Sequence, residues 1–477
     1  MITDCTTTTF AFQPLGTRDV LACFDGGAVT SDGGALLLGE AERLTGALQQ
    51  FAKCFTDYRQ ADAIEHTVLQ LLSQRVYGLA LGYEDLNDHD SLRLDPLLAT
   101  LVGKTDPSGQ DRLRPQDKGK PLAGKSTLNR LELTPLDANA DSRYQKIVAA
   151  PRAIERLFVD LFVQAQGTPP VEIVLDLDAT DDPLHGHQEG RFFHGYYKEY
   201  CYLPLYVFCG EYLLLSQLRT ADNDASSGTV EMLTWLIVQL RAVWPAVRIV
   251  LRGDSGFCRE AIMAWCEEHD VDYVFGLAKN SRLEEAIVTH MVDAHVRYLL
   301  TGVAARVFAD FRYQTRDSWS RQRRVVGKAE YLPKGANPRF VVTSLASEDW
   351  PADVLYEQRY CARGEMENRI KEQQLMLFAD RTSTAWLRSN QLRLWFSSLA
   401  YVLMQTVRCR GLAATPQAKA QCGSLRVWLL KIGALVRVTA RKVWVSLSSA
   451  WPYRAVFAQV YANLRGAVAT CPLPSSS

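Results

Sequence analysis

Val171-Glu-Ile-Val-Leu-Asp-Leu-Asp178 is the stretch around which the rest of the chain can be arranged. Its valine, isoleucine and leucine residues predict a buried β-strand that ends in acid. Side chains alternate along a strand, so Asp176 and Asp178 face the same side. Of the two, we expect Asp178 to be functional, because it lies at the end of the strand next to Thr180.

The segments after this strand predict an α/β unit. Strands over 202–209 and 212–218 flank the turn Gly210-Glu211. Helices are expected over 227–243, 259–269 and near 283–292, alternating with strands over 247–251 and 273–277. This order is that of a ribonuclease-H-like fold, in which the first and fourth strands are neighbours. Asp254, in the Arg-Gly-Asp-Ser-Gly run after the fourth strand, would then lie beside Asp178.

A third carboxylate comes from Tyr360-Cys-Ala-Arg-Gly-Glu-Met-Glu-Asn-Arg-Ile-Lys-Glu-Gln-Gln374. On a regular helix, one sector of about 80° would hold Tyr360, Arg363, Glu367, Lys371 and Gln374. Apolar residues beside this sector would dock the helix on a core. Taken alone, the stretch fits a solvated face with i,i+4 pairing equally well.

Asp178, Asp254 and Glu367 together are the ligands that hard divalent cations prefer. Two such ions roughly 4 Å apart activate a nucleophile and stabilise the leaving oxygen in phosphoryl transfer. Read singly, each acid would be a turn or cap residue. A transition-metal site at His185 and His187 is less favoured, because a glycine between the histidines leaves their loop poorly preorganised.

Residues 297–349 predict a β-rich insertion between the second aspartate and Glu367. Runs at 306–313, 323–331 and 339–344 alternate as antiparallel strands do. Arg323 and Arg324 lie there among further cations. The cation density favours a DNA-facing or solvated sheet over a purely structural one.

The composition is that of an ordinary globular protein. With 477 residues, 47% of them hydrophobic and 22% charged, the chain is long enough for two to four structural units. No apolar run reaches the roughly 20 residues of a membrane span, and no basic-then-apolar leader begins the chain. We therefore expect no membrane partner and a cytoplasmic location. The eleven scattered cysteines contain no Cys-x-x-Cys pair, which argues against a zinc knuckle or a secreted disulfide framework.

The balanced total of 53 basic and 53 acidic residues hides an asymmetry. Thirteen Lys and Arg and no Asp or Glu lie between Arg381 and Ser477, which leaves 40 basic and 53 acidic residues before Arg381. Tryptophans are interleaved with these cations. The pattern favours a nucleic-acid partner. The alternative is that the cations neutralise the acidic part of the same protein.

The pattern along the chain predicts five parts. These are an N-terminal mainly helical DNA-binding part over 1–140, a ribonuclease-H-like core over 141–296 and 350–405, the insertion over 297–349, and a basic C-terminal helical part over 406–477. Gly119-Lys-Pro-Leu-Ala-Gly-Lys-Ser126 matches the letters of a P-loop. No strand precedes it, and Pro121 lacks a needed N–H. We therefore read Ser126 as the N-cap of a helix through Leu133.

Most of the chain resembles the DDE transposases of bacterial insertion sequences, and within them the group akin to piggyBac elements. Leu177-Asp-Ala-Thr180, Arg252-Gly-Asp-Ser-Gly-Phe257 and the spacing Tyr-x2-Arg-x3-Glu at Tyr360, Arg363 and Glu367 carry the resemblance. It implies a magnesium-dependent (or manganese-dependent) endonuclease that cuts transposon ends and transfers strands to target DNA. Two ions would be held by Asp178, Asp254 and Glu367.

The resemblance also implies partners and further site residues. We expect double-stranded DNA, as terminal inverted repeats and target, bound by a homodimer at the bacterial nucleoid. Tyr360 and Arg363 would position phosphates. The wider family has a lysine seven residues after the glutamate, where this chain has Gln374, so we expect Lys371 to contact a phosphate instead. Trp319 would stabilise a flipped base at a hairpin.

Two other functions fit the same residues. One is a nuclease of the same fold that cuts without joining. The other is a DNA-binding protein whose acidic cluster is degenerate.

Overall fold

The computed structural model describes residues 8–470, with side chains through residue 467. The chain divides into two compact units. One comprises Met1–Ala150, Met376–Phe378 and Leu399–Ser477, and the other Pro151–Leu375 and Ala379–Ser398. No helix within the described range is long and apolar enough to cross a membrane.

The second unit is built on a nine-stranded mixed sheet. Its first five strands, in spatial order, are β11 (Tyr212–Gln217), β10 (Leu205–Cys209), β6 (Glu172–Ala179), β12 (Arg248–Gly253) and β13 (Asp272–Leu277). β10 is antiparallel to β11 and β6, whereas β6, β12 and β13 run parallel. The prediction that the first and fourth strands are neighbours is confirmed, with Gly253 opposite Leu177.

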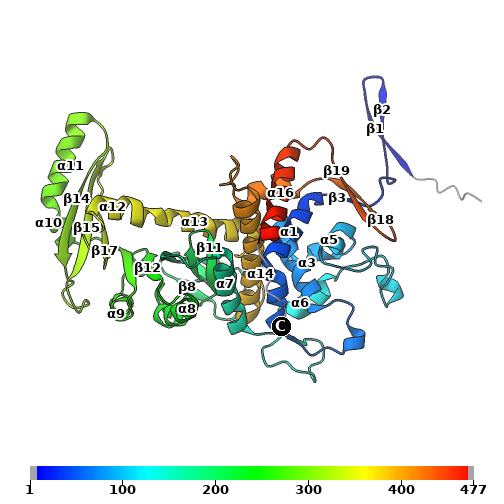
Figure 1. The fold of residues 1–477 in the computed structure, drawn as a ribbon, viewed down its shortest axis with the longest axis horizontal. Helices are drawn as coiled ribbons and strands as arrows, with labels where there is room; N and C mark the ends of the chain where they lie inside the picture. The colour runs from blue at the N-terminus through cyan, green and yellow to red at the C-terminus, as the bar shows by residue number, and fades with distance from the viewer. Residues whose placement is uncertain (1–7, 471–477) are drawn as a thin grey trace, which may run out of the picture. The chain divides into compact units, whose positions relative to one another are not determined.

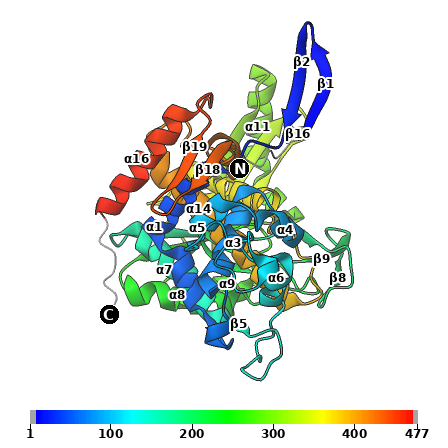
Figure 2. The ribbon, with the colours of Figure 1, turned by 90° about the vertical axis from the view of Figure 1, so that its right-hand side faces the viewer.

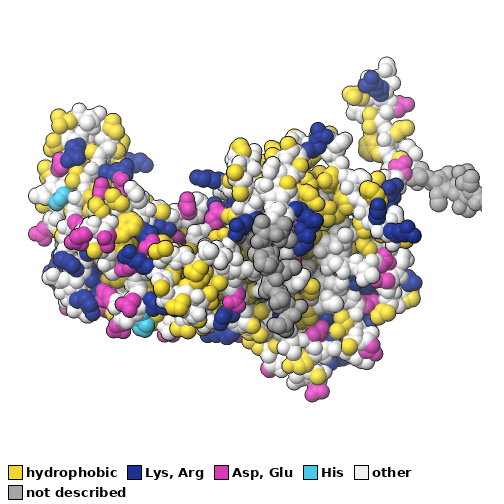
Figure 3. All heavy atoms as spheres, in the orientation of Figure 1, with side chains coloured by type: hydrophobic (Ala, Val, Ile, Leu, Met, Phe, Trp, Pro, Cys, Tyr) yellow, Lys and Arg dark blue, Asp and Glu magenta, His cyan; other side chains and the backbone are white. Residues whose placement is uncertain are grey.

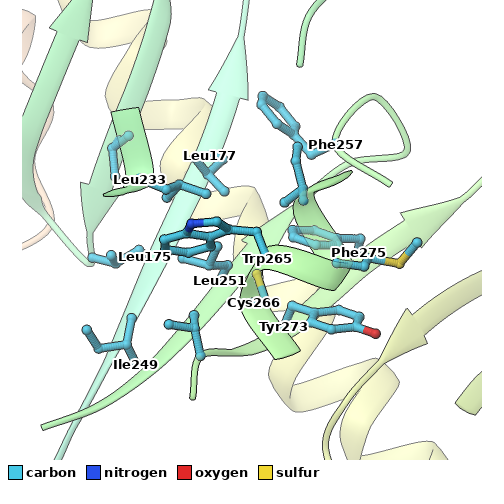
Figure 4. Packing of buried hydrophobic residues seen from close by; sticks show 14 of the residues in the cluster. Leu175, Leu177, Leu233, Ile249, Leu251, Phe257, Trp265, Cys266, Tyr273 and Phe275 are labelled. Atoms are coloured by element: carbon cyan, nitrogen blue, oxygen red, sulfur yellow. The ribbon is translucent and has the colours of Figure 1, made fainter. Parts of the chain in front are cut away.

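One face of this sheet carries the main apolar core. Leu175 and Leu177 of β6 and Leu251 of β12 pack with side chains of α8 (Thr229–Val243) and α9 (Glu260–Glu268), as Figure 4 shows. α7 (Pro151–Gln166) packs against β11 and α8. Because side chains alternate along a strand, Asp176 and Asp178 belong to the opposite face of the sheet.

That opposite face is covered by an irregular helical segment. It runs through α12 (Ala352–Val354), a π-helical turn (Leu355–Tyr360), a 3₁₀ turn (Cys361–Arg363), α13 (Gly364–Lys371) and a second π-helical turn (Glu372–Met376). Leu355 and Tyr356 pack on Val250 and Val274 of the sheet. The expectation of one regular helix over 360–374 is therefore wrong, and π-helical turns are frequent near functional sites.

The insertion extends the same sheet. β17 (Arg339–Thr343) pairs with β13, and β15 (Arg323–Leu332) and β14 (Ala305–Tyr313) follow in order, with β16 (Gly335–Ala336) beside β15. α11 (Val288–Thr301) packs against β14 and β15 (Figure 1). Val325 and Phe340 belong to the same apolar cluster as Leu175 and Leu251. The insertion and the five-stranded core therefore share one hydrophobic interior.

The first unit contains both ends of the described chain. Its N-terminal helices include α1 (Leu36–Thr45), α2 (Ala47–Lys53) and α3 (Val68–Leu81), and α16 (Arg454–Thr470) packs against α1 (Figure 2). β18 (Ala434–Val438) and β19 (Val443–Leu447) form a hairpin that pairs with β3 (Val29–Thr30). The C-terminal part is therefore mixed, where a helical part was predicted.

A second hairpin lies near the N-terminus. β1 (Thr9–Leu15) pairs antiparallel with β2 (Arg18–Cys23). Every residue of both strands is exposed, including Phe12 and Leu21. Figure 3 shows these apolar side chains on the surface.

Candidate active site

Three carboxylates from distant segments meet at the carboxyl edge of β6 and β12. Asp178 is the penultimate residue of β6, and Asp254 directly follows β12, its parallel neighbour. Glu367 comes from α13 on the face that Asp178 occupies. Burial, together with the negative charges of Asp254 and Glu367, raises the pKa of Asp178 to about 6. The three predicted acids are thus brought within electrostatic reach of one another.

Arg363 lies between two of these acids. Its Nη2 donates to Oε1 of Glu367 at 2.6 Å, and its Nη1 donates to Oδ2 of Asp178 at 3.3 Å. Burial opposes the charge of Arg363, but the neighbouring carboxylates of Asp178 and Glu367 outweigh it and raise its pKa. Arg363 therefore holds a glutamate of the helix and an aspartate of the sheet together.

Tyr360 approaches the second aspartate from the same helical segment. A Cβ added at Gly276 of β13 would lie 2.6 Å from the Tyr360 hydroxyl and 3.0 Å from the Ser255 nitrogen. Burial and the charge of Asp254 raise the pKa of Tyr360, although Arg363 opposes this. Gly276 is therefore needed for the phenol to reach the loop after β12, since any side chain would occupy that space.

Asp176 is engaged in a buried ion pair. Arg252 donates Nε to Oδ1 of Asp176 at 2.5 Å and Nη2 to Oδ2 at 2.8 Å. Its Nη1 donates to the carbonyl of Arg359 at 2.5 Å, which ties the sheet to the helix that carries Tyr360. Asp176 is only 2% exposed. Both of its oxygens serve a structural contact, which leaves Asp178 as the accessible acid of the pair.

Lys371 and Gln374 have different environments. The Gln374 Nε2 donates to the backbone carbonyl of Asp181 at 2.9 Å, so this side chain holds the loop that follows Asp178. Lys371 is exposed, and within the described residues no ion pair or hydrogen bond engages its side chain. Gln374, at the position of the expected lysine, thus fixes a loop of the protein, while the Lys371 side chain is free to bind a ligand.

The donor set suits a hard divalent cation. Asp178, Asp254 and Glu367 offer carboxylate oxygens, the ligands that Mg²⁺ and Mn²⁺ prefer. Their mutual repulsion, seen in the raised pKa of Asp178, would be relieved by a bound cation. As arranged here, with Arg363 between two of them, no three His, Cys, Asp or Glu side chains of the described range are placed to hold one ion.

The structure does not support the predicted DNA contacts of the insertion. Trp319 is 6% exposed and packs edge-on against Tyr313, with ring centroids 5.7 Å apart. Arg323 is 2% exposed and pairs with Glu260 and Glu267. The Arg323 ion pairs join the insertion to α9, and Trp319 packs inside the insertion. Both side chains therefore contact protein where a DNA contact was predicted.

Arg324 is likewise internal. It is 6% exposed, pairs with Asp310 at 2.6 Å and donates to the carbonyls of Leu345 and Trp350. Both guanidinium groups are buried and bonded to protein acceptors, so neither lies on the surface that a DNA phosphate would meet.

Two residues of this region were not predicted from the sequence. Arg252 was quoted only as part of a motif, yet it connects Asp176 to the helix. Tyr197 is partly buried, and the charges of Asp181, Asp178 and Asp254 add to burial in raising its pKa. A signal for Arg252 was its position on the strand beside an acidic neighbour. Tyr197 lies in a loop, and no periodicity in the sequence indicates where that loop goes.

Comparison with known proteins gives the class. Residues 12–469 match the family described as Transposase DDE domain group 1, so this chain belongs to that family. A structure that it resembles is the cryo-EM structure of the piggyBac transposase synaptic complex with hairpin DNA. The TM-score is 0.39 and the identity 12%, over 93% of this chain and 86% of that one. No curated protein matches the chain significantly.

Proposed function

We propose that this protein is a transposase that cuts DNA at transposon ends and joins the cut strands to target DNA. The observation that carries the proposal is the convergence of Asp178, Asp254 and Glu367 in a chain of the DDE transposase family. The spatial strand order β11-β10-β6-β12-β13 supports a ribonuclease-H-like core. The spacing of Tyr360, Arg363 and Glu367 supports assignment to the Tyr-Arg-Glu group of bacterial insertion sequences.

The chemistry would be phosphoryl transfer. Asp178, Asp254 and Glu367 would hold two Mg²⁺ or Mn²⁺ ions, which when bound activate the attacking oxygen and stabilise the leaving one. Arg363 uses Nη1 and Nη2 for the acids, and its guanidinium has further N–H donors for a phosphate. Tyr360 would orient the same phosphate through its hydroxyl.

DNA is the proposed partner, as terminal inverted repeats and as target. Exposed cations on the β18–β19 hairpin are Arg437, Arg441 and Lys442, and Lys442 lies 5.3 Å from the ring of the exposed Trp444. Lys431 of the basic part is already paired, since it contacts Asp32 at 2.7 Å. The exposed group supports a phosphate-binding surface. A homodimer on DNA in the bacterial cytoplasm, at the nucleoid, completes the proposal.

The direct test is metal-dependent cleavage of a duplex taken from the ends of the DNA element that encodes the protein. We expect wild type to cut in Mg²⁺ and Asp254→Ala to be inactive. Glu365→Gln is the matched control, because Glu365 is an exposed acid on the same helix. Equal cleavage by wild type and Asp254→Ala would contradict the assignment.

A nuclease without joining is the second candidate. Strand-transfer products on a plasmid target separate the two activities. Cleavage without such products would support the nuclease, and DNA binding without cleavage would support a degenerate binding protein. Short inverted repeats bounding the gene would favour the transposase.

A further inference from the structure

A basic cavity of about 320 Å³ in the first unit is lined by residues between 59 and 147. Its wall contains six cations and three carboxylates. The cations are Arg59, Arg93, Arg112, Arg114, Arg130 and Lys146. An excess of positive charge around a hollow of this size indicates an anionic ligand.

Only some of the cations in the wall form ion pairs with its carboxylates. Glu65 pairs with Arg112 at 2.9 Å, and Asp117 pairs with Arg93 at 3.0 Å. Asp90 contacts Lys125 outside the cavity wall.

Three cations of the wall remain unbalanced. Among the described residues, no carboxylate pairs with Arg114, Arg130 or Lys146. Arg130 instead lies 5.1 Å from the centre of the Tyr144 ring. The Lys146 ammonium donates to the backbone carbonyl of Ala140 and has two further N–H donors. All three cations therefore have donors for a ligand.

His66 adds an unpartnered polar atom to the wall. Its side chain is 5% exposed, and its Nε2 is buried without a hydrogen-bond partner. Arg59 fixes the histidine backbone by donating to its carbonyl at 3.0 Å. Burial and the charges of Lys104 and Arg112 lower the pKa of His66 to about 3. A buried polar nitrogen without a partner is costly unless a ligand or water satisfies it.

The N-terminus of α6 (Lys125–Glu132) also lines the cavity. Its N-cap is Gly124 and not Ser126, the residue predicted from the sequence, and the Asp90 carboxylate accepts from the Lys125 backbone N–H at 3.1 Å. A Cβ added at Gly124 would lie 2.9 Å from Nη1 of Arg93. Gly124 therefore lets a guanidinium approach the first turn of the helix, where the helix dipole favours an anion and the Asp90 carboxylate already lies.

This helix start is the end of the P-loop-like stretch. A short 3₁₀ helix (Pro115–Asp117) precedes it instead of a strand, so the nucleotide-binding arrangement is absent from this segment. What remains of the motif is a glycine before a helix start in a cavity wall that contains five arginines.

We propose that this cavity binds a phosphate group, supplied by the DNA backbone or as free phosphate. The phosphate would accept hydrogen bonds from Arg130, Arg114 and Lys146 at the mouth and from His66 deeper in the wall. If the phosphate belongs to DNA, the inference rests on the proposed function. The cavity would then be the place where the N-terminal part contacts one phosphate of the DNA backbone.

The test compares Arg130→Gln with Arg143→Gln in the full chain. Both side chains contact the Tyr144 ring, at 5.1 Å and 4.8 Å, but only Arg130 lines the cavity. Binding of a duplex from the element ends is measured without divalent metal at several salt concentrations. We expect Arg130→Gln to reduce the slope of log K against log[salt] by about one, while Arg143→Gln leaves it unchanged. Both arginines are exposed, and equal melting temperatures would confirm that folding is intact.

A second arm uses inorganic phosphate. The imidazole NMR signal of His66, identified by its loss in His66→Asn, should shift on titration of wild type and not of Arg130→Gln. A shift with an unchanged duplex slope would identify free phosphate as the ligand. A reduced slope would identify the DNA backbone. If neither the slope nor the signal depends on Arg130, the proposal is overturned.

The two proposals fail differently. The binding assay contains no divalent metal and so does not depend on cleavage. If wild type does not cleave DNA, the transposase proposal is contradicted, but the proposal of a phosphate-binding cavity is not. The opposite result is cleavage by wild type, a salt dependence of DNA binding that is unchanged in Arg130→Gln, and no phosphate-dependent shift of the His66 signal. It would support the transposase and contradict the phosphate cavity.

Discussion

Asp176 and Asp178 lie two residues apart on β6 and have different surroundings. Asp176 is buried and paired through both oxygens with Arg252. Asp178 is 18% exposed and has acids as neighbours, which together with burial raise its pKa. Burial therefore raises the pKa of both carboxyls, but at Asp176 it is opposed by a paired arginine, whereas at Asp178 two neighbouring acids add to it.

Substitution by Asn should have different effects on stability and on cleavage at Asp176 and at Asp178. Asp176→Asn leaves Arg252 without its charged partner, and we expect it to lower the free energy of unfolding by about 3 kcal/mol. Asp178→Asn should abolish metal-dependent cleavage and raise stability in metal-free buffer at pH 8 by about 3 kcal/mol. Urea unfolding and cleavage assays measure the two effects.

The pH dependence of the second effect has a definite sign. The folded pKa of Asp178 is raised from 3.8 to about 6, so its ionisation costs stability above pH 6 and nothing below the unfolded value. The advantage of Asp178→Asn should fade as the pH falls from 6 to 4. An advantage that persists at pH 4 would show that charge is not its cause.

Lys371 and Gln374 offer a second comparison on one helix. Lys371→Gln should reduce the salt slope of DNA binding by about one without changing stability, because an exposed cation contributes mainly by releasing counterions. Gln374→Ala should leave that slope unchanged and slow cleavage, since it frees the loop after Asp178. Anisotropy titrations and single-turnover rates measure these effects. A reduced slope in Gln374→Ala instead would place that residue in DNA contact.

At the scale of elements, the junction of the insertion with α9 depends on buried side chains of the β14–β15 connection and of β15 itself. Trp319→Ala should therefore lower the free energy of unfolding by about 3–5 kcal/mol, because it removes a large buried ring. Trp319→Phe should retain most of the stability. Thermal unfolding measures the stability of both variants. If Trp319→Ala is as stable as wild type but no longer forms a DNA hairpin, the role of Trp319 in stacking on a flipped base would be supported instead.

The helix that carries Glu367 shows what periodicity can predict. Tyr360, Arg363 and Glu367 share a side, as a 3.6-residue repeat predicts. The π-helical turns at 355–360 and 372–376 change the register on both sides of α13. Their cause is tertiary, because Leu355 and Tyr356 must reach the sheet while Gln374 must reach Asp181.

At the scale of the whole molecule, buried neutral histidines should make the protein sensitive to acid. His89 is 0% exposed, its Nδ1 lies 3.1 Å from the Gln74 amide nitrogen, and burial with the charge of Arg75 lowers its pKa to about 3. His66 has a similarly lowered pKa. Because the folded pKa is below the unfolded value of 6.5, the stability is present above pH 6.5 and lost as the pH falls toward 3.

We expect each of these histidines to contribute a loss of about 2 kcal/mol between pH 7 and pH 5. His89→Gln should remove its share of the pH dependence, as measured by urea unfolding at both pH values. His185→Gln is the control, because His185 is exposed. The same pH dependence in His89→Gln and wild type would mean that His89 is not the titrating group.

The sequence by itself determined the strand order of the core and the identity of its acidic ends. Alternation along Val171 to Asp178 and the helix–strand sequence after it are local properties, and neighbouring parallel strands then place Asp178 beside Asp254. The spacing of Tyr360, Arg363 and Glu367 is local in the same sense.

Only the tertiary structure decided how the cations are used. Arg323 finds Glu260 and Glu267 63 and 56 residues away, and Arg252 finds Asp176 across 76 residues. No local pattern distinguishes such a buried, paired arginine from one that meets DNA. The reason is physical: the free energy of a charge depends on burial and on partners that the folded chain brings from distant segments.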